Sequence, residues 1–164
     1  MEETYIFAVD PADKLSGWCL LMGSTYRPIR FGKSSNADMF DTVRTLPPGL
    51  HTVVVIEMVA SYGMPVGREV FETCVTIGRI EQLCDSLGMD HARIYRQEEK
   101  LTICHSPKAN DATIKQALVD RFASGERNYG KGTKKNPGWF YGFHADVWSA
   151  YAVGVTYLDK RSKE

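Results

Sequence analysis

The sequence contains no Cys-x-x-Cys pair, the spacing that marks many zinc sites and redox centres. Its four cysteines, Cys19, Cys74, Cys84 and Cys104, are scattered along 164 residues. Scattered cysteines in a chain of this size indicate reduced thiols and argue against both a zinc site and a disulfide framework. We therefore expect four free cysteines, mostly buried, in a protein of the cytosol.

Long apolar runs are also absent. No segment approaches the roughly 20 apolar residues of a membrane-spanning helix. Residues 1–7 carry no basic residue of the kind that opens a secretory signal. We therefore expect no membrane association and no signal segment. With 43% hydrophobic and 24% charged residues, residues 1–164 are predicted to form one domain, in which 160–164 are a frayed tail.

An excess of charge of either sign is missing as well, since 20 Lys and Arg balance 20 Asp and Glu. The whole-chain charge therefore gives no indication of a nucleic-acid partner, but its distribution does. Between residues 121 and 135, five basic residues stand against Glu126 alone. A local basic segment can contact phosphates even in a neutral protein. The basic residues of this segment are Arg121, Arg127, Lys131, Lys134 and Lys135.

Periodicity and turn signals predict five strands and four helices. Pro28 places the third strand at a sheet edge, because proline has no N–H to donate to a neighbouring strand. Three strands come first and later strands alternate with helices. This order predicts an α/β fold with a mixed five-stranded sheet, an antiparallel meander plus parallel strands, flanked by helices. The expected strands are 4–10, 15–22, 26–32, 52–58 and 93–96, and the expected helices are 35–44, 66–87, 111–122 and 145–158.

Two of the predicted buried strands end on a carboxylate. Residues 5–9 run directly into Asp10, and the apolar run 52–56 continues into Glu57. A lone charge is costly to bury, so an acid in this position either marks the exit into solvent or is paired. If the two strands are neighbours, their ends bring both acids together. Adjacent carboxylates that no nearby Lys or Arg neutralises are what a hard cation such as Mg²⁺ recruits.

Asp146 stands at the start of the last predicted helix. An acid there also complements the helix dipole, and that explanation has equal weight when the residue is taken alone. Together with Asp10 and Glu57 it completes a set of three carboxylates. Such a set can hold two divalent ions, Mg²⁺ or Mn²⁺, roughly 3.5–4 Å apart for in-line phosphodiester hydrolysis. One ion would activate a water and the other would stabilise the leaving 3′ oxygen.

A family resemblance is carried by four stretches: AVDPADKLSGWCL (8–20), VVIEMVASYGMPVGREVFETCVTIGRIEQL (54–83), SPKANDATIKQALVDRF (106–122) and DVWSAYAVGVTYLD (146–159). In this order they resemble RuvC-type Holliday-junction resolvases, most of all the versions carried by bacteriophages and prophages. The resemblance covers most of the chain. It implies a ribonuclease-H-like fold, dependence on Mg²⁺ or Mn²⁺, and a homodimer that cuts four-way DNA junctions with paired nicks in the cytoplasm of a bacterial host.

The sequence departs from the family pattern at two positions. Ala12 replaces the glycine that usually follows the first acid and its proline. On the last helix the family carries two acids, or a His and an Asp, three residues apart; the first of these positions is Asp146, and the second is Ser149. A serine can bind a metal through its hydroxyl or a water but brings no charge. His144 and Asp111 are nearby substitutes for the missing fourth ligand.

The resemblance also points to DNA contacts. In the family the loop after the second acid carries an aromatic residue that stacks on unpaired bases, and Tyr62 is the matching residue. Stacking on a base contributes about 1–3 kcal/mol, whereas a loop aromatic can also simply cover the core. Basic side chains predicted to contact phosphates are Arg68, Lys108, Lys115, Lys131, Lys134 and Lys135, although each taken alone could equally be a solvated surface charge.

These features predict a metal-dependent, structure-specific endonuclease that cleaves branched DNA, with Asp10, Glu57 and Asp146 as catalytic metal ligands. Helix 66–87 is apolar on more than one face, so it lies either deep in the core or in a dimer seam. One alternative is a branched-DNA-binding protein with weak or no cleavage, because Ser149 replaces an acid. Another is a phosphotransferase or ATPase of the actin-like superfamily. Those proteins need two such domains around a nucleotide and this chain has room for one, so no nucleotide cofactor is expected.

Overall fold

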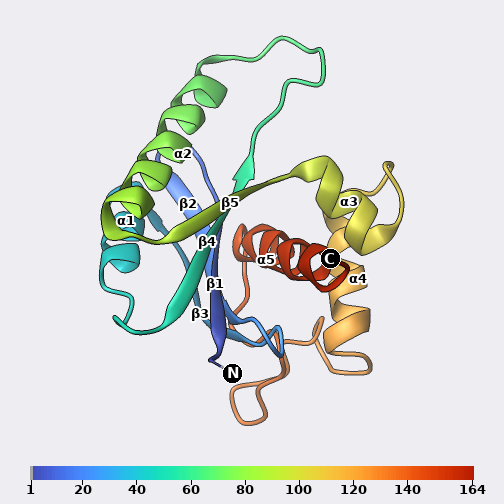
Figure 1. Ribbon diagram of the computed structural model, residues 1–164. Helices are drawn as coiled ribbons and strands as arrows, with labels where there is room; N and C mark the ends of the chain where they lie inside the picture. Colours follow the sequence, from blue (N-terminus) through green and yellow to red (C-terminus); the bar gives the residue numbers. More distant parts are fainter. Residues whose placement is uncertain (1) are drawn as a thin grey trace.

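A computed structural model describes residues 2–164, whose five strands form one mixed sheet in the order β3-β2-β1-β4-β5 (Figure 1). β1 pairs antiparallel with β2 and β2 with β3, whereas β1 pairs parallel with β4 and β4 with β5. The predicted mixed sheet is therefore confirmed, and Pro28 does lie on an edge strand. The strands are β1 Thr4–Asp10, β2 Leu15–Met22, β3 Pro28–Ser35, β4 His51–Met58 and β5 Asp90–Tyr95.

Helices cover both faces of the sheet (Figure 1). Because β1 is buried on both faces, its side chains alternate between two hydrophobic cores. Ile6 and Ala8 lie in the core between the sheet and α5. Phe7 and Val9 lie in the core between the sheet and helices α1 and α2. This arrangement explains why the strand reads as an unbroken apolar run. The helices are α1 Asn36–Arg44, α2 Arg68–Leu87, α3 Arg96–Cys104, α4 Asp111–Phe122 and α5 Val147–Ser162.

Two expectations about the helices were wrong. Helix α3 follows β5 at once and was not predicted, because its sequence RQEEKLTIC lacks an apolar stripe and its one fully buried residue is Glu99. The segment 160–164 is not wholly a frayed tail, since α5 continues to Ser162. Two contacts hold this last turn. Asp159 accepts hydrogen bonds from Tyr26 and Arg121, and Lys160 pairs with Glu98.

Helix α2 is not deep in the core. Its residues Ile77, Ile80 and Cys84 are buried against the sheet, while Phe71 and Val75 are exposed. Of the two explanations for its wide apolar surface, burial in the core is therefore excluded. The loop between β4 and α2 runs out beyond the sheet, so that α2 lies on the outside of the molecule (Figure 1).

All four cysteines are free, as expected. Cys19 and Cys84 are buried, but Cys74 is exposed on α2 and Cys104 is half-buried, so the thiols are less buried than predicted. None of the helices in residues 2–164 is long and apolar enough to cross a membrane.

Candidate active site

The ends of β1 and β4 bring Asp10 and Glu57 side by side. These strands are parallel neighbours, with Val9 opposite Ile56, so the next residue of each strand is the predicted acid. Parallel strands end at the same edge of a sheet, where α/β proteins commonly form their sites. The alternative that Glu57 simply marks an exit into solvent does not apply, because its Oε2 atom is buried.

Asp146 comes to this edge from a helix and not from a strand: it is the N-cap residue of α5. Its approach depends on Gly17, which lies opposite Asp10 in the β1–β2 ladder. A Cβ atom on Gly17 would lie 2.6 Å from the carbonyl oxygen of Asp146 and 2.7 Å from its Cβ. Glycine at this position therefore lets the start of α5 touch the sheet.

The three acids interact electrostatically. The pKa of Asp10 is raised to about 7, first by burial and then by the negative charges of Glu57 and Asp146. Lys33 and Arg96 lower it in part. The structure therefore brings together the three carboxylates that the sequence singled out, and the other two disfavour the ionised form of Asp10.

Lys33, on β3, pairs with Asp146, with 2.7 Å between Nζ and Oδ2. It faces Gly17 across the β2–β3 ladder, so Asp10, Gly17 and Lys33 form one row across the sheet. The Asp146 carboxylate raises the pKa of Lys33. Sequence reasoning missed this residue, because nothing distinguishes a single lysine on an edge strand until the register is known.

Glu99 is the second residue that sequence reasoning missed. Its side chain is 0% exposed and lies in hydrogen-bonding contact with Glu57. Burial, and then the charge of Glu57, raise the pKa of Glu99 to about 10. Burial also raises the pKa of Glu57, although the bond to Glu99 and the charge of Arg96 oppose this. A signal in the sequence would have been the acids at the start of α3, had that helix been recognised.

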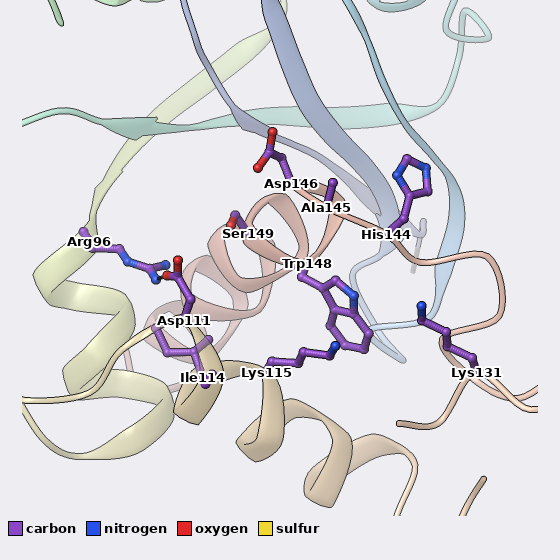
Figure 2. Close-up of a pocket in the computed structure, with 11 residues that line it drawn as sticks. Arg96, Asp111, Ile114, Lys115, Lys131, His144, Ala145, Asp146, Trp148 and Ser149 are labelled. Atoms are coloured by element: carbon purple, nitrogen blue, oxygen red, sulfur yellow. Dashed lines mark ion pairs between the residues drawn. The ribbon is translucent and has the colours of Figure 1, made fainter. Parts of the chain in front are cut away.

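A cavity of about 520 Å³ opens beside Asp146 and runs between the start of α5 and the start of α4 (Figure 2). Arg96 and Asp111 form an ion pair at its wall. The Lys115 Nζ atom lies 4.4 Å from the centroid of the Tyr129 ring and 4.8 Å from that of the Trp148 ring. The polar and charged residues of its lining are Arg96, Asp111, Lys115, Lys131, His144, Asp146 and Ser149.

The three candidates for the missing fourth ligand, Asp111, His144 and Ser149, thus line the same cavity as Asp146. Asp111 is engaged by Arg96. Figure 2 shows the His144 ring lying apart from Ser149, beyond Asp146 and Ala145. The structure therefore places all three near Asp146 without joining any of them to the pair Asp10 and Glu57.

The donor set fits a hard divalent cation. Asp10, Glu57 and Asp146 supply oxygen donors, and the buried Oε2 atom of Glu57 has no hydrogen-bond partner in residues 2–164. An orphaned carboxylate oxygen beside two further acids favours a cation. As the side chains stand, no three His, Cys, Asp or Glu residues of this described range are grouped closely enough to hold a metal, and Lys33 holds Asp146 instead.

The residues predicted to contact DNA fall into separate groups. Lys115 and Lys131 line the cavity beside Asp146. Tyr62 is 63% exposed, in the loop after β4, and its φ is +49°. Arg68 begins α2, its side chain exposed and 3.8 Å from Glu72. The structure brings two of the predicted lysines to the cavity, whereas Tyr62 lies in the loop after β4 and Arg68 at the start of α2.

The other predicted basic residues lie on the surface. Lys108 is exposed between α3 and α4, and Lys134 and Lys135 are exposed in the loop that follows α4. This loop is folded back on itself by backbone hydrogen bonds, among them those from Gly138 to Lys131 and from Phe140 to Gly130. Its lysines are therefore presented from a turn whose backbone is held in place.

Comparison with known proteins found matches in three-dimensional structure alone. No family model matches the sequence, and no curated protein matches it either. RuvC of Thermus thermophilus in complex with Holliday junction substrate matches with a TM-score of 0.69 at 10% identity, over 98% of this chain and 96% of that one. A second Thermus thermophilus RuvC structure matches with a TM-score of 0.66 at 11% identity, over 97% and 96%. This chain therefore has the ribonuclease-H-like fold of the RuvC Holliday-junction resolvase structures, as the resemblance in its sequence implied.

Proposed function

We propose that this protein is a divalent-metal-dependent endonuclease that cleaves branched DNA, with the four-way junction as its substrate. The proposal rests chiefly on one observation: Asp10, Glu57 and Asp146 converge at one sheet edge on the fold of RuvC. A structure of that fold holds Holliday junction substrate. A phosphotransferase of the actin-like kind is disfavoured, because the fold match covers nearly the whole chain with one RuvC-like unit.

In this proposal Asp10, Glu57 and Asp146 hold Mg²⁺ or Mn²⁺. The bound ions would supply an activated water and stabilise the leaving 3′ oxygen. Lys115 and Lys131 attract a phosphate to the cavity beside Asp146, where the planes of Tyr129 and Trp148 keep the Lys115 ammonium in position. Lys33 neutralises Asp146 until a cation takes that carboxylate.

A second candidate is a protein that binds branched DNA and cleaves it slowly or not at all. Ser149 brings no charge where the family carries an acid, and the ion pair of Asp146 with Lys33 competes with metal binding. Cleavage is favoured because the three other acids are present and crowd one another, an arrangement that would be costly to keep without a cation.

Metal and substrate dependence test the proposal. A fixed four-way junction and a linear duplex of the same sequence are incubated with protein in Mg²⁺, in Mn²⁺ and in chelator. We expect paired, symmetric nicks in the junction alone, which disappear when the metal is removed because the crowded carboxylates then lack the ions that activate water. Tight junction binding without cleavage in either metal would select the binding protein instead.

We also propose that α2 forms a homodimer interface, because Phe71 and Val75 are exposed on its outer side and a two-fold dimer matches the symmetry of a four-way junction. Phe71→Glu is expected to convert the dimer into a monomer in sedimentation velocity, since a charge would be buried without a partner. Ala37→Glu adds the same charge at an exposed position of α1, away from this face of α2, and serves as control. A monomeric wild type, or a Phe71→Glu variant that stays dimeric, would contradict this interface.

A further inference from the structure

Glu99 lies in the first half of α3 and is fully buried, although glutamate is rarely buried without a partner. Its Oε1 atom accepts a hydrogen bond from Arg96 at 3.1 Å. Its Oε2 atom is buried and has no hydrogen-bond partner within residues 2–164. The nearest acid is Glu57, whose own buried Oε2 atom is equally without a partner. Two orphaned carboxylate oxygens thus occur on side chains that touch each other.

The charges around this pair do not balance it. Arg96 is the cation that acts on both carboxyl groups, and it is shared with Asp111. Lys33 is engaged by Asp146. Buried carboxylates in contact are tolerated only with a proton or a cation between them. The orphaned oxygens therefore mark a place for a proton or a cation, because the described side chains supply no further positive charge there.

One position of the ligand set that the resemblance implies carries no acid, and an acid outside that set lies beside Glu57. Ser149, on α5, stands where the family resemblance implies a second acid of that helix, and its hydroxyl carries no charge. Glu99 approaches from another element, α3, and contacts the carboxylate of β4 rather than that of α5. Because β5 pairs with β4 and leads directly into α3, α3 begins beside the end of β4 that carries Glu57.

We propose that Glu99 is the fourth carboxylate of the divalent-metal site and binds an ion together with Glu57, in the role that Ser149 does not fill. This inference rests on the proposed metal-dependent function and assigns one further ligand to it. Carboxylates from β1, β4, α3 and the start of α5 would then surround the cations. Arg96, which already bonds Oε1 of Glu99, orients that carboxylate so that Oε2 faces the ion.

Direct Mn²⁺ binding tests the assignment without relying on cleavage. Wild type, Glu99→Gln, Glu99→Asp and Asp10→Asn are titrated with Mn²⁺ and followed by electron paramagnetic resonance and calorimetry, in the absence of DNA. Glu69→Gln, at an exposed position of α2, is the matched control for the loss of one acid. We expect Glu99→Gln to bind at least about tenfold more weakly than wild type. Glu99→Asp keeps the charge and should bind more tightly than the Gln variant.

Thermal unfolding separates a ligand from a purely structural residue. Without metal, Glu99→Gln should be as stable as wild type or more so, because it removes a buried carboxyl beside Glu57. Saturating Mn²⁺ should raise the melting temperature of wild type, and it should raise that of Glu99→Gln by clearly less. Loss of stability in chelator together with an unchanged Mn²⁺-induced gain would overturn the assignment and make Glu99 structural.

The outcomes for the two proposals differ. If wild type binds Mn²⁺ and Glu99→Gln binds it equally well, Glu99 is not a ligand, while the proposed nuclease stands. If wild type binds no Mn²⁺, the metal site as a whole is overturned and the assignment of Glu99 with it. If Glu99→Gln and Asp10→Asn both bind Mn²⁺ weakly and Glu69→Gln binds it as tightly as wild type, the metal site and the assignment of Glu99 are both supported.

Discussion

Asp10→Asn is expected to reduce metal-dependent junction cleavage by at least about 10³-fold, because a lost metal ligand removes several kcal/mol of charge stabilisation. Binding of the junction in chelator should be unchanged, since the lysines of the cavity are untouched. The same substitution should make the metal-free protein more stable. An asparagine keeps the size of the side chain and removes a charge that burial, Glu57 and Asp146 all disfavour.

The pH dependence follows from the raised pKa of Asp10. In the unfolded chain Asp10 loses its proton near its ordinary value, 3.8, whereas in the folded protein it keeps the proton up to about pH 7. Between these values the unfolded state binds fewer protons, so wild type loses stability as pH rises. This decrease in the free energy of unfolding is complete above about pH 7 and amounts to about 2–4 kcal/mol. The free energy of unfolding of Asp10→Asn should not decrease in this way, because asparagine does not titrate.

Urea unfolding of both proteins in chelator at pH 5 and pH 8 measures the effect. The stability gap in favour of Asp10→Asn should be larger at pH 8, and added Mg²⁺ should close it by stabilising wild type alone. Glu69→Gln, which removes an exposed acid, should show no such gap. A gap that is equal at both pH values would show that Asp10 has an ordinary pKa, and undiminished cleavage would remove it from the site.

Gly17→Ala is expected to damage both the fold and the activity. The added Cβ would lie within 2.8 Å of three atoms of Asp146, two of them backbone atoms that cannot rotate away. The start of α5 must then move off the sheet and carry Asp146 with it. We expect a loss of about 2–3 kcal/mol in the free energy of unfolding, the upper range for overpacking. Cleavage should fall by about 10²-fold, as expected for a displacement near 1 Å.

Gly78→Ala is the matched control, because Gly78 lies within α2 and a Cβ there meets nothing within 4 Å. This variant should gain about 0.5–1 kcal/mol, since alanine favours a helix over glycine. Chemical denaturation is measured on both variants, and junction cleavage is measured on Gly17→Ala against wild type. If Gly17→Ala behaved like Gly78→Ala, the close approach of α5 to β2 would not be what positions Asp146.

The two acids at strand ends could be read from the sequence because their signal is local. An unbroken apolar run that stops on Asp10 or Glu57 reports a doubly buried strand and its end without reference to any other part of the chain. The mixed sheet was predictable for a similar reason, since the order of strands and helices along the chain restricts the topology. Asp146 needed both the helix start and the family resemblance.

Lys33 and Glu99 could not be read in this way. Lys33 is defined by the strand register, which places it opposite Gly17 and within reach of Asp146. Glu99 is distinguished by its burial. The start of α3 is polar, so the hydrophobic pattern of the sequence does not indicate that this side chain is buried. Neither the register nor the burial of a charged residue is a property of neighbours in sequence.

The sequence by itself determined the strands, every helix of residues 2–164 except α3, the mixed sheet and the three acids, because hydrophobic pattern and chain order act over short separations. Only the tertiary structure decided which charges meet: Lys33 with Asp146, Arg96 with Asp111, and Glu99 with Glu57. The physical reason is that the energy of a charge depends on what surrounds it in three dimensions. At this site the surroundings of each acid come from several different elements of the fold.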